Sequence, residues 1–191
     1  MKATTIAVAA MFVAIIVGVG WALAMVPNVE FITAVAFTAG ACLGILKGTF
    51  IGIIGIFIFS ATNPVGSGLA FPLLLLAQMV SLGLIGAAGG LIAKLPDKRL
   101  ATRSSRVVLA AAGLLLTIIY DGLTSITFPL FAGAPLSEIA AVLISGLVFT
   151  AIHQVSNTII FFSLVPRLIA VSRRALSKRA DLASTGAENG L

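Results

Sequence analysis

Long apolar stretches, separated by short segments that carry nearly all of the charges, constrain this chain more than any other feature. A helix needs about 20 predominantly apolar residues to cross the hydrocarbon core of a bilayer. The chain has room for six such helices, and most of the apolar stretches end at or beside a proline, where a helix tends to stop. We therefore predict an all-α integral membrane protein with six transmembrane helices, over residues 3–26, 31–46, 49–61, 71–93, 107–128 and 139–165.

The composition agrees with this class and excludes others. Of the 191 residues, 60% are hydrophobic and 9% are charged, whereas a soluble domain carries about 25% charged residues. A cytosolic globular enzyme and a disordered chain are both excluded. The single cysteine, Cys42, excludes an internal disulfide framework and a metal site with several cysteines. Because the sequence has no P-loop, HExxH or similar motif, we predict no catalytic residue, no metal and no cofactor, and expect that the chain is not an enzyme.

The second and third stretches need separate treatment, because residues 31–61 form an almost continuous apolar run. One helix of that length would be about 46 Å long, which exceeds a hydrocarbon core of about 30 Å. Residues 44–48 offer two glycines and a lysine for a tight turn. We therefore predict a hairpin of two short helices.

The positive charges predict the orientation of the chain. With the N-terminus in the cytoplasm, all 12 Lys and Arg residues fall on the cytoplasmic side, as the positive-inside rule requires. Both termini are then cytoplasmic, residues 1–170 form the six-helix transmembrane domain, and residues 171–191 form a basic, polar cytoplasmic tail. Topology thus accounts for the net charge of +6, and we expect the bilayer, not nucleic acid, as the partner of these charges. An anionic-lipid or nucleic-acid role for the tail is the alternative.

The first stretch also resembles a cleavable signal peptide, since Lys2 precedes an apolar run that ends in Ala22-Leu23-Ala24. The run is long for a signal peptide and five further spans are predicted after it. We therefore expect it to be retained as a transmembrane helix.

Small residues recur at helical spacing and predict close contacts between helices. One series runs along the predicted hairpin and a second along the fourth span: Ala36, Gly40, Gly44, Gly48 and Gly52, and Gly83, Gly86, Gly89 and Gly90. An alanine stripe on the first span, Ala7, Ala10 and Ala14, can face lipid or form a surface on which a partner membrane protein docks.

Polar residues within the spans predict a binding site. Counting 1.5 Å per residue from the nearest cytoplasmic lysine or arginine places five polar residues from five spans at about 21–26 Å, in one layer of the outer half of the membrane. These are Glu30, Asn63, Gln78, Asp121 and His153, with Tyr120 and Asn157 beside them and Trp21, Asn28 and Phe71 at the rim. Such a layer is typical of a small-molecule pocket open to the outside.

Each of these residues also has a structural interpretation. Asp121 can pair with His153, and His153 with Asn157 can form an interhelical hydrogen-bond clamp. Glu30 and Asn63 can be loop ends exposed to water. Gln78 is the strongest site candidate, because a primary amide in the middle of a helix must find a partner.

The order of several short motifs resembles the substrate-binding S components of energy-coupling factor (ECF) vitamin transporters. The resemblance covers residues 3–168 and rests on seven pieces: AVAAMFVA at 7–14, PNVEF at 27–31, the glycine series of 40–55, NPVG at 63–66, PLLLLAQ at 72–78, YDGLT at 120–124 and HQVSN at 153–157. It implies a six-helix subunit in the cytoplasmic membrane of a prokaryote. It also implies that the subunit binds a vitamin or related micronutrient outside the cell and docks on a transmembrane T component coupled to two ATP-binding subunits.

In that family the docking face is an alanine stripe on the first helix, which corresponds here to Ala10 and Ala14. The connections at 25–31 and 62–72 would line or cover the pocket. Because Glu30 and Asp121 lie with His153, a neutral or cationic nitrogen heterocycle is favoured over an acid, and a cobalamin-type or other B-vitamin precursor is the expected ligand.

Two other functions compete with this interpretation. A stand-alone proton-coupled carrier would use Asp121 and His153 as a relay. A structural subunit would bind no ligand at all.

Overall fold

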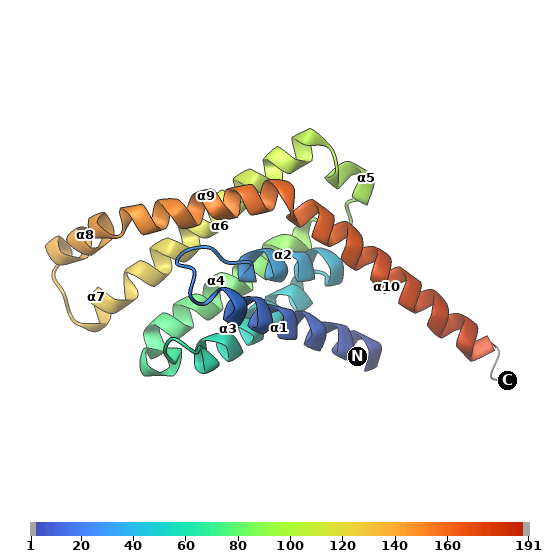
Figure 1. Ribbon diagram of the computed structural model, residues 1–191, viewed down its shortest axis with the longest axis horizontal. Coiled ribbons are helices and arrows are strands. Elements are labelled where there is room, and N and C mark those ends of the chain that lie inside the picture. Colours follow the sequence, from blue (N-terminus) through green and yellow to red (C-terminus); the bar gives the residue numbers. More distant parts are fainter. Residues whose placement is uncertain (1–2, 189–191) are drawn as a thin grey trace.

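The computed structural model describes residues 3–188, so Lys2 and residues 189–191 of the predicted tail lie outside the described residues. The regular structure of residues 3–188 is helical, and the longer helices lie side by side in an elongated bundle (Figure 1). The helices are α1 (Ala3–Leu23), α2 (Ile32–Leu43), α3 (Ile45–Thr62), the 3₁₀ turn η1 (Gly68–Ala70), α4 (Pro72–Leu91), α5 (Asp97–Leu100), α6 (Arg103–Ser125), α7 (Thr127–Phe131), α8 (Leu136–Ser145), α9 (Leu147–Ser163) and α10 (Val165–Glu188).

Four candidate membrane spans stand out by length and apolar character: α1, α3, α4, and α6 continued through α7. The pair α8 and α9 counts as a fifth if its bend of 53° lies within one span. The second stretch expected from the sequence contains α2, which has 12 residues and is about 18 Å long, too short to cross a core of about 30 Å. Residues 3–188 are thus all-α and contain four to five candidate spans.

The predicted hairpin at residues 31–61 is confirmed, and its turn is shorter than expected. Gly44 alone separates α2 from α3, with φ of 90°, a conformation that glycine adopts without steric cost. Gly40 and Gly48, each four residues from Gly44, are in contact: a Cβ on Gly48 would lie 2.5 Å from the Cα of Gly40. Lys47 therefore belongs to the first turn of α3 and not to a loop.

The glycines of α2, α3 and α4 form the tightest interface of the bundle. A Cβ on Gly86 would lie 2.1 Å from the carbonyl oxygen of Gly48, and a Cβ on Gly89 would lie 1.9 Å from that of Phe37. Any side chain at these positions would push the backbones apart. The expectation that these small residues mediate close helix packing is confirmed.

Helices α6 and α9 form a second closely packed pair beside this core. Gly113 of α6 lets the ring of Phe161 approach, since a Cβ there would lie 2.4 Å from that ring. Phe161 in turn packs edge-on against Phe37 of α2, with ring centroids 5.1 Å apart. This contact joins the α6–α9 pair to the glycine-rich half of the bundle.

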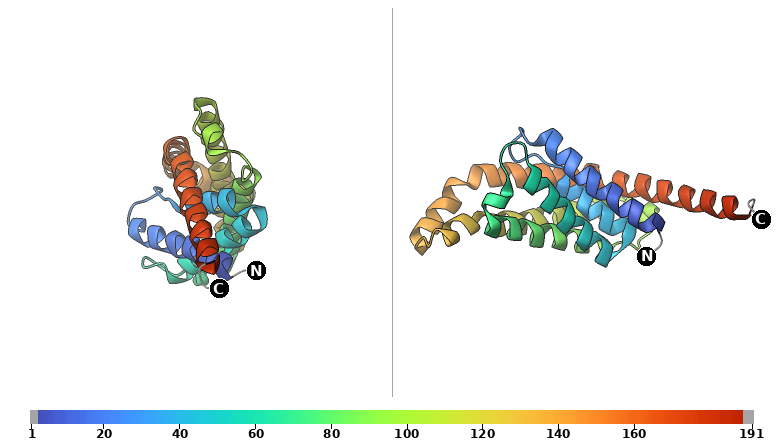
Figure 2. Two further views of the ribbon diagram at one scale, coloured as in Figure 1. Left: turned by 90° about the vertical axis from the view of Figure 1, so that its right-hand side faces the viewer. Right: turned by 90° about the horizontal axis from the view of Figure 1, so that it is seen from below.

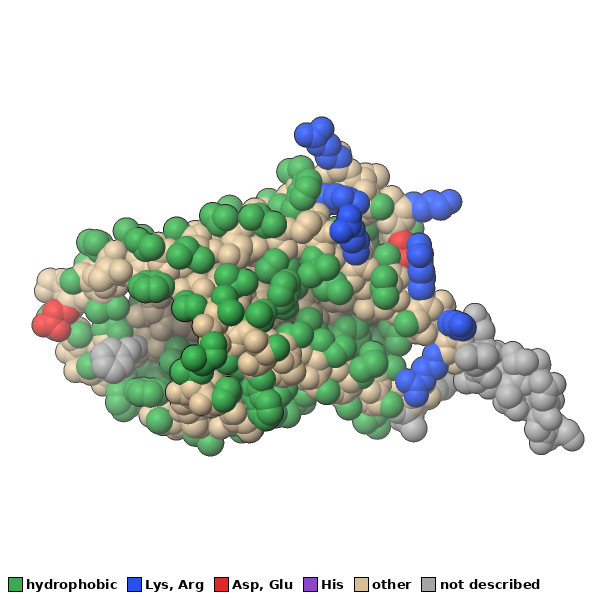
Figure 3. Space-filling view, in the orientation of Figure 1, with side chains coloured by type: hydrophobic (Ala, Val, Ile, Leu, Met, Phe, Trp, Pro, Cys, Tyr) green, Lys and Arg blue, Asp and Glu red, His purple; other side chains and the backbone are tan. Residues whose placement is uncertain are grey.

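The start of α1 and the end of α10 lie at the same end of the bundle, and α10 continues well beyond the other helices (Figure 2). Many of the lysine and arginine side chains visible on one face gather toward this end, while the middle of that face is largely apolar (Figure 3). This segregation of charge is the pattern expected of a chain whose apolar middle lies in a bilayer.

Arg173 of α10 connects several segments at this end of the bundle through hydrogen bonds and an ion pair. Its guanidinium donates hydrogen bonds to the carbonyl oxygens of Ala41, Ile92, Ala93 and Leu95 and pairs with the carboxylate of Asp97 at 2.9 Å. These carbonyls lie at the C-terminal ends of α2 and α4, where helices leave acceptors unpaired, and in the connection from α4 to α5. One side chain thus fixes α10 against two helix ends and the start of α5.

Candidate ligand-binding site

A cavity of about 400 Å³ opens where the α1–α2 connection meets the C-terminal half of α6 and the middle of α9. Its apolar wall includes Phe59 and Phe149. The polar side chains that line it come from both halves of the bundle: Asn28, Glu30, Thr33, Asn63, Tyr120, Asp121, Thr124, Ser125, Thr150 and His153. A cavity of this size with a few convergent polar groups is typical of a small-molecule site.

His153 is held between two carboxylates. Its Nδ1 lies 2.7 Å from Asp121 Oδ1, and its Nε2 lies 3.5 Å from Glu30 Oε1. The His153 and Asp121 side chains are only 8% and 12% exposed, so both groups are largely shielded from solvent. Because both ring nitrogens face carboxylate oxygens, a doubly protonated ring can donate to both of them.

Asn157 lies one turn from His153 on α9 and is fully buried. Its Nδ2 lies 3.1 Å from Thr117 Oγ1, 3.1 Å from His153 Nε2 and 3.2 Å from Glu30 Oε1. The Thr117 hydroxyl donates its own hydrogen to the Gly113 carbonyl, so it accepts from the amide. The amide has one remaining hydrogen for two acceptors.

This competition gives His153 two hydrogen-bonded arrangements. In one, a neutral ring donates from Nδ1 to Asp121 and accepts at Nε2 from Asn157. In the other, the protonated ring donates from Nε2 toward Glu30. The site can therefore take up one proton without losing the bond to Asp121.

Glu30 is positioned by the start of α2. Its carboxylate accepts a hydrogen bond from the backbone N–H of Thr33 at 2.9 Å and another from the Thr33 hydroxyl. The carboxylate thus satisfies a backbone N–H of the first turn of α2, where the positive end of the helix dipole favours a negative charge. The α1–α2 connection thus holds Glu30 against the α6–α9 pair.

Two hydrogen-bond acceptors of the site have no partner within residues 3–188. Among the described residues, Asp121 Oδ2 and Asn157 Oδ1 are buried without a hydrogen-bond partner. Buried polar atoms are normally satisfied, so a group that supplies hydrogen-bond donors suits this place. Tyr120 completes the wall, with its ring edge-on to that of His153 at 5.8 Å between centroids.

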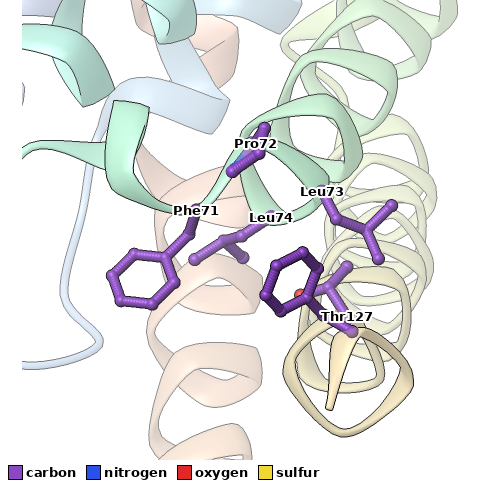
Figure 4. A pocket seen from close by; sticks show the side chains of 6 residues that line it. Phe71, Pro72, Leu73, Leu74 and Thr127 are labelled. Carbon is purple, nitrogen blue, oxygen red and sulfur yellow. The ribbon is translucent and has the colours of Figure 1, made fainter. Parts of the chain in front are cut away.

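Four of the predicted site residues are absent from this cavity's lining. One of them is Asn157, the fully buried amide described above. Gln78 accepts a hydrogen bond from the Ser60 hydroxyl at 2.6 Å and so joins α4 to α3. The Trp21 and Phe71 side chains are half exposed. Phe71 lines a separate, apolar cavity of about 200 Å³ with Leu74 and Thr127, between the start of α4 and α7 (Figure 4).

The alanine stripe of α1 faces outward. Ala7, Ala10 and Ala14 are exposed, whereas Val8 and Phe12 on the opposite face are buried in the core. The surface is therefore accessible to lipid or to another helix.

Sequence reasoning missed the residues that orient the site. Thr117 precedes Asp121 by one helical turn, and Thr33 follows Glu30 by three residues at the expected start of a helix, where backbone N–H groups lack partners within the helix. That second spacing was a usable signal. Ser60 had none, because nothing in the sequence pairs it with Gln78. Within the part of the chain that the structure describes, no group of three or more His, Cys, Asp or Glu residues is arranged to hold a metal ion.

Comparison of the chain with protein-family models, with curated proteins and with solved structures found no match. The geometry of the cavity and the helical, membrane-type architecture therefore carry the functional argument.

Proposed function

We propose that the chain is the membrane-embedded substrate-binding subunit of an ECF-type importer. The observation that carries this proposal is the cavity of about 400 Å³ whose wall combines Glu30, Asp121 and His153 with aromatic side chains. The motif order that resembles S components supports the same function. In this proposal the chain lies in the cytoplasmic membrane of a prokaryote with both termini inside, and the short helix α2 occupies the place of the second predicted span.

The cavity favours a ligand that donates hydrogen bonds. Two carboxylates and an unpaired Asp121 oxygen suit an amine or a protonated ring nitrogen, while Tyr120 and Phe149 suit a flat ring. A nitrogen heterocycle of vitamin type, neutral or cationic, meets both requirements. A cobalamin-type or other B-vitamin precursor remains the leading expectation from the sequence.

A partner would supply the energy for transport. The sequence contains no P-loop, and the exposed stripe of Ala7, Ala10 and Ala14 offers a smooth surface to a transmembrane T component. That component, coupled to two ATP-binding subunits, would release the ligand to the cytoplasm.

The decisive experiment is to purify the chain in detergent, denature it and identify released small molecules by mass spectrometry. We expect one vitamin-like compound per chain, much reduced in Asp121→Asn and retained in Glu138→Gln, which changes an exposed acid on α8. A protein that releases nothing, and whose melting temperature no vitamin raises, would contradict the proposal.

A second candidate, a stand-alone proton-coupled carrier, is favoured by one observation. The His153–Asp121 pair at 2.7 Å and the two arrangements of His153 form a group that can carry a proton. This candidate expects uptake by the chain alone in liposomes under a pH gradient, lost in His153→Gln. Uptake that depends entirely on added T component and ATPases would exclude it.

A further inference from the structure

We propose that the cavity between α5 and the first turns of α6 binds one anionic phospholipid, with its phosphate at Arg99 and Ser104 and an acyl chain along Val108. This site lies at the basic end of the molecule, apart from the cavity that contains His153. It is independent of the transported ligand.

The shape and lining of this cavity fit a lipid. It measures about 460 Å³ and combines one arginine and three hydroxyl residues with five aliphatic residues: Arg99, Thr102, Ser104 and Ser105, and Ile92, Leu95, Leu100, Val108 and Leu109. The hydroxyl residues belong to the start of α6, whereas Val108 and Leu109 follow one turn further along. Polar and apolar linings thus succeed each other along the helix, as the headgroup and chain of a lipid do.

Two donors at the polar part are available. The Thr102 hydroxyl is engaged with Ser105 and with the Arg99 carbonyl, so it serves the helix cap. Among the described residues, the Arg99 guanidinium and the Ser104 hydroxyl make no hydrogen bond, and both side chains are exposed. An arginine and a hydroxyl are donors that phosphate oxygens accept well.

The local charge is strongly positive. Residues 94–106 carry five basic residues and one acidic residue, Asp97. Asp97 is paired with Arg173 at 2.9 Å, so its charge is compensated from another helix. In addition, Arg106 has a buried Nε without a hydrogen-bond partner in the described part of the chain. An anion at this end would meet this excess of positive charge.

The apolar surroundings favour a lipid over free phosphate. Val107 and Val108 are 54% and 67% exposed at the start of a candidate membrane span. Side chains of this kind on a spanning helix face hydrocarbon. Basic pockets beside transmembrane helices on the cytoplasmic side are known to hold lipid headgroups.

The test uses the full chain in nanodiscs that contain equal amounts of phosphatidylglycerol and phosphatidylcholine, followed by native mass spectrometry. We expect each chain to retain one phosphatidylglycerol molecule in preference to phosphatidylcholine. In Arg99→Gln, the ratio of retained phosphatidylglycerol to retained phosphatidylcholine should fall on the order of fivefold. Arg179→Gln, which removes the same charge from an exposed position on α10, serves as the control and should keep the preference.

Three results would overturn the proposal. Equal retention of the two lipids by the unmodified chain would show no anionic site. Equal losses in Arg99→Gln and Arg179→Gln would show a general charge effect. Displacement of the retained lipid by millimolar inorganic phosphate would show that the site recognises free phosphate. Equal melting temperatures of all three proteins in phosphatidylcholine alone would show that the variants fold.

Discussion

Arg173 shows how much of this bundle a single side chain holds. Its guanidinium contacts backbone carbonyls at the ends of α2 and α4 and the carboxylate of Asp97. Helix ends carry unpaired carbonyls and a partial negative charge, so a cation there satisfies both. Arg173 is only 18% exposed, whereas Arg174 beside it is exposed. Substituting Arg173 and Arg174 in turn therefore compares a largely buried arginine with an exposed one on the same helix.

We predict that Arg173→Ala lowers the free energy of unfolding by about 2 kcal/mol, because it leaves several acceptors unpaired. For a chain of this size that corresponds to roughly 4–8 °C in melting temperature. Thermal unfolding in detergent would measure it, with Arg174→Ala as the control. Similar melting temperatures for the two variants would contradict this role of Arg173.

At the residue scale, part of the site could be predicted and part could not. Asp121 and His153 were expected at one depth, and their pairing was foreseen as the structural alternative. Depth counting works because helix rise is regular, but it carries no information about which face of each helix turns inward. Gln78 shares the predicted depth, and its amide instead accepts from Ser60 on α3.

At the scale of elements, the glycine interface between α3 and α4 makes a sharp prediction. Gly86→Ala would place a methyl group 2.1 Å from the carbonyl oxygen of Gly48, which is backbone and cannot rotate away. We expect a loss of about 1–3 kcal/mol as the helices separate, or failure to fold.

Gly18→Ala is the matched control, because a Cβ at Gly18 of α1 meets nothing within 4 Å. Alanine is the better helix former, so we expect an equal or higher melting temperature there. If both variants melted at the same temperature, the close contact between Gly48 and Gly86 would be refuted.

The helix ends expected from proline and glycine agree with the structure at Gly44. They disagree with it where a proline or glycine has another role. Gly146 follows Ser145 and bends the expected sixth span by 53°, as such Gly/Ser pairs do, yet average hydropathy does not register it. Pro166, expected as an end, lies in the first turn of α10, where its missing N–H costs nothing.

At the scale of the whole molecule, the common location of the start of α1, the end of α10 and the basic residues predicts the topology. In cells carrying Cys42→Ser, a cysteine introduced by Glu138→Cys should react with a membrane-impermeant maleimide added outside. A cysteine introduced by Lys98→Cys should react only after the membrane is permeabilised, because positively charged loops stay in the cytoplasm. Labelling of both positions from one side would contradict the orientation.

The outward stripe of α1 predicts that binding and transport can be separated. In Ala10→Leu or Ala14→Leu, larger side chains would prevent close approach of a partner helix. Ligand affinity should stay unchanged, because neither residue lines the cavity, while uptake in cells should fall at least about tenfold. Ala22→Leu, an exposed position of the same helix outside the stripe, should retain uptake. Normal uptake by the stripe variants would show that α1 is not the docking surface.

The shortness of α2 has a consequence for how the protein is made. Residues 32–41 of this helix are all buried by other parts of the chain, so lipid never provides its native environment. A nascent helix of 12 residues gains too little from the bilayer to insert alone, and its tightest contacts are with α4, which is synthesised later. We therefore expect the α2–α3 hairpin to enter the membrane as one unit and its glycine face to stay uncovered until α4 follows. On this view α2 reaches its place by assembly with its neighbours and not by partitioning into lipid.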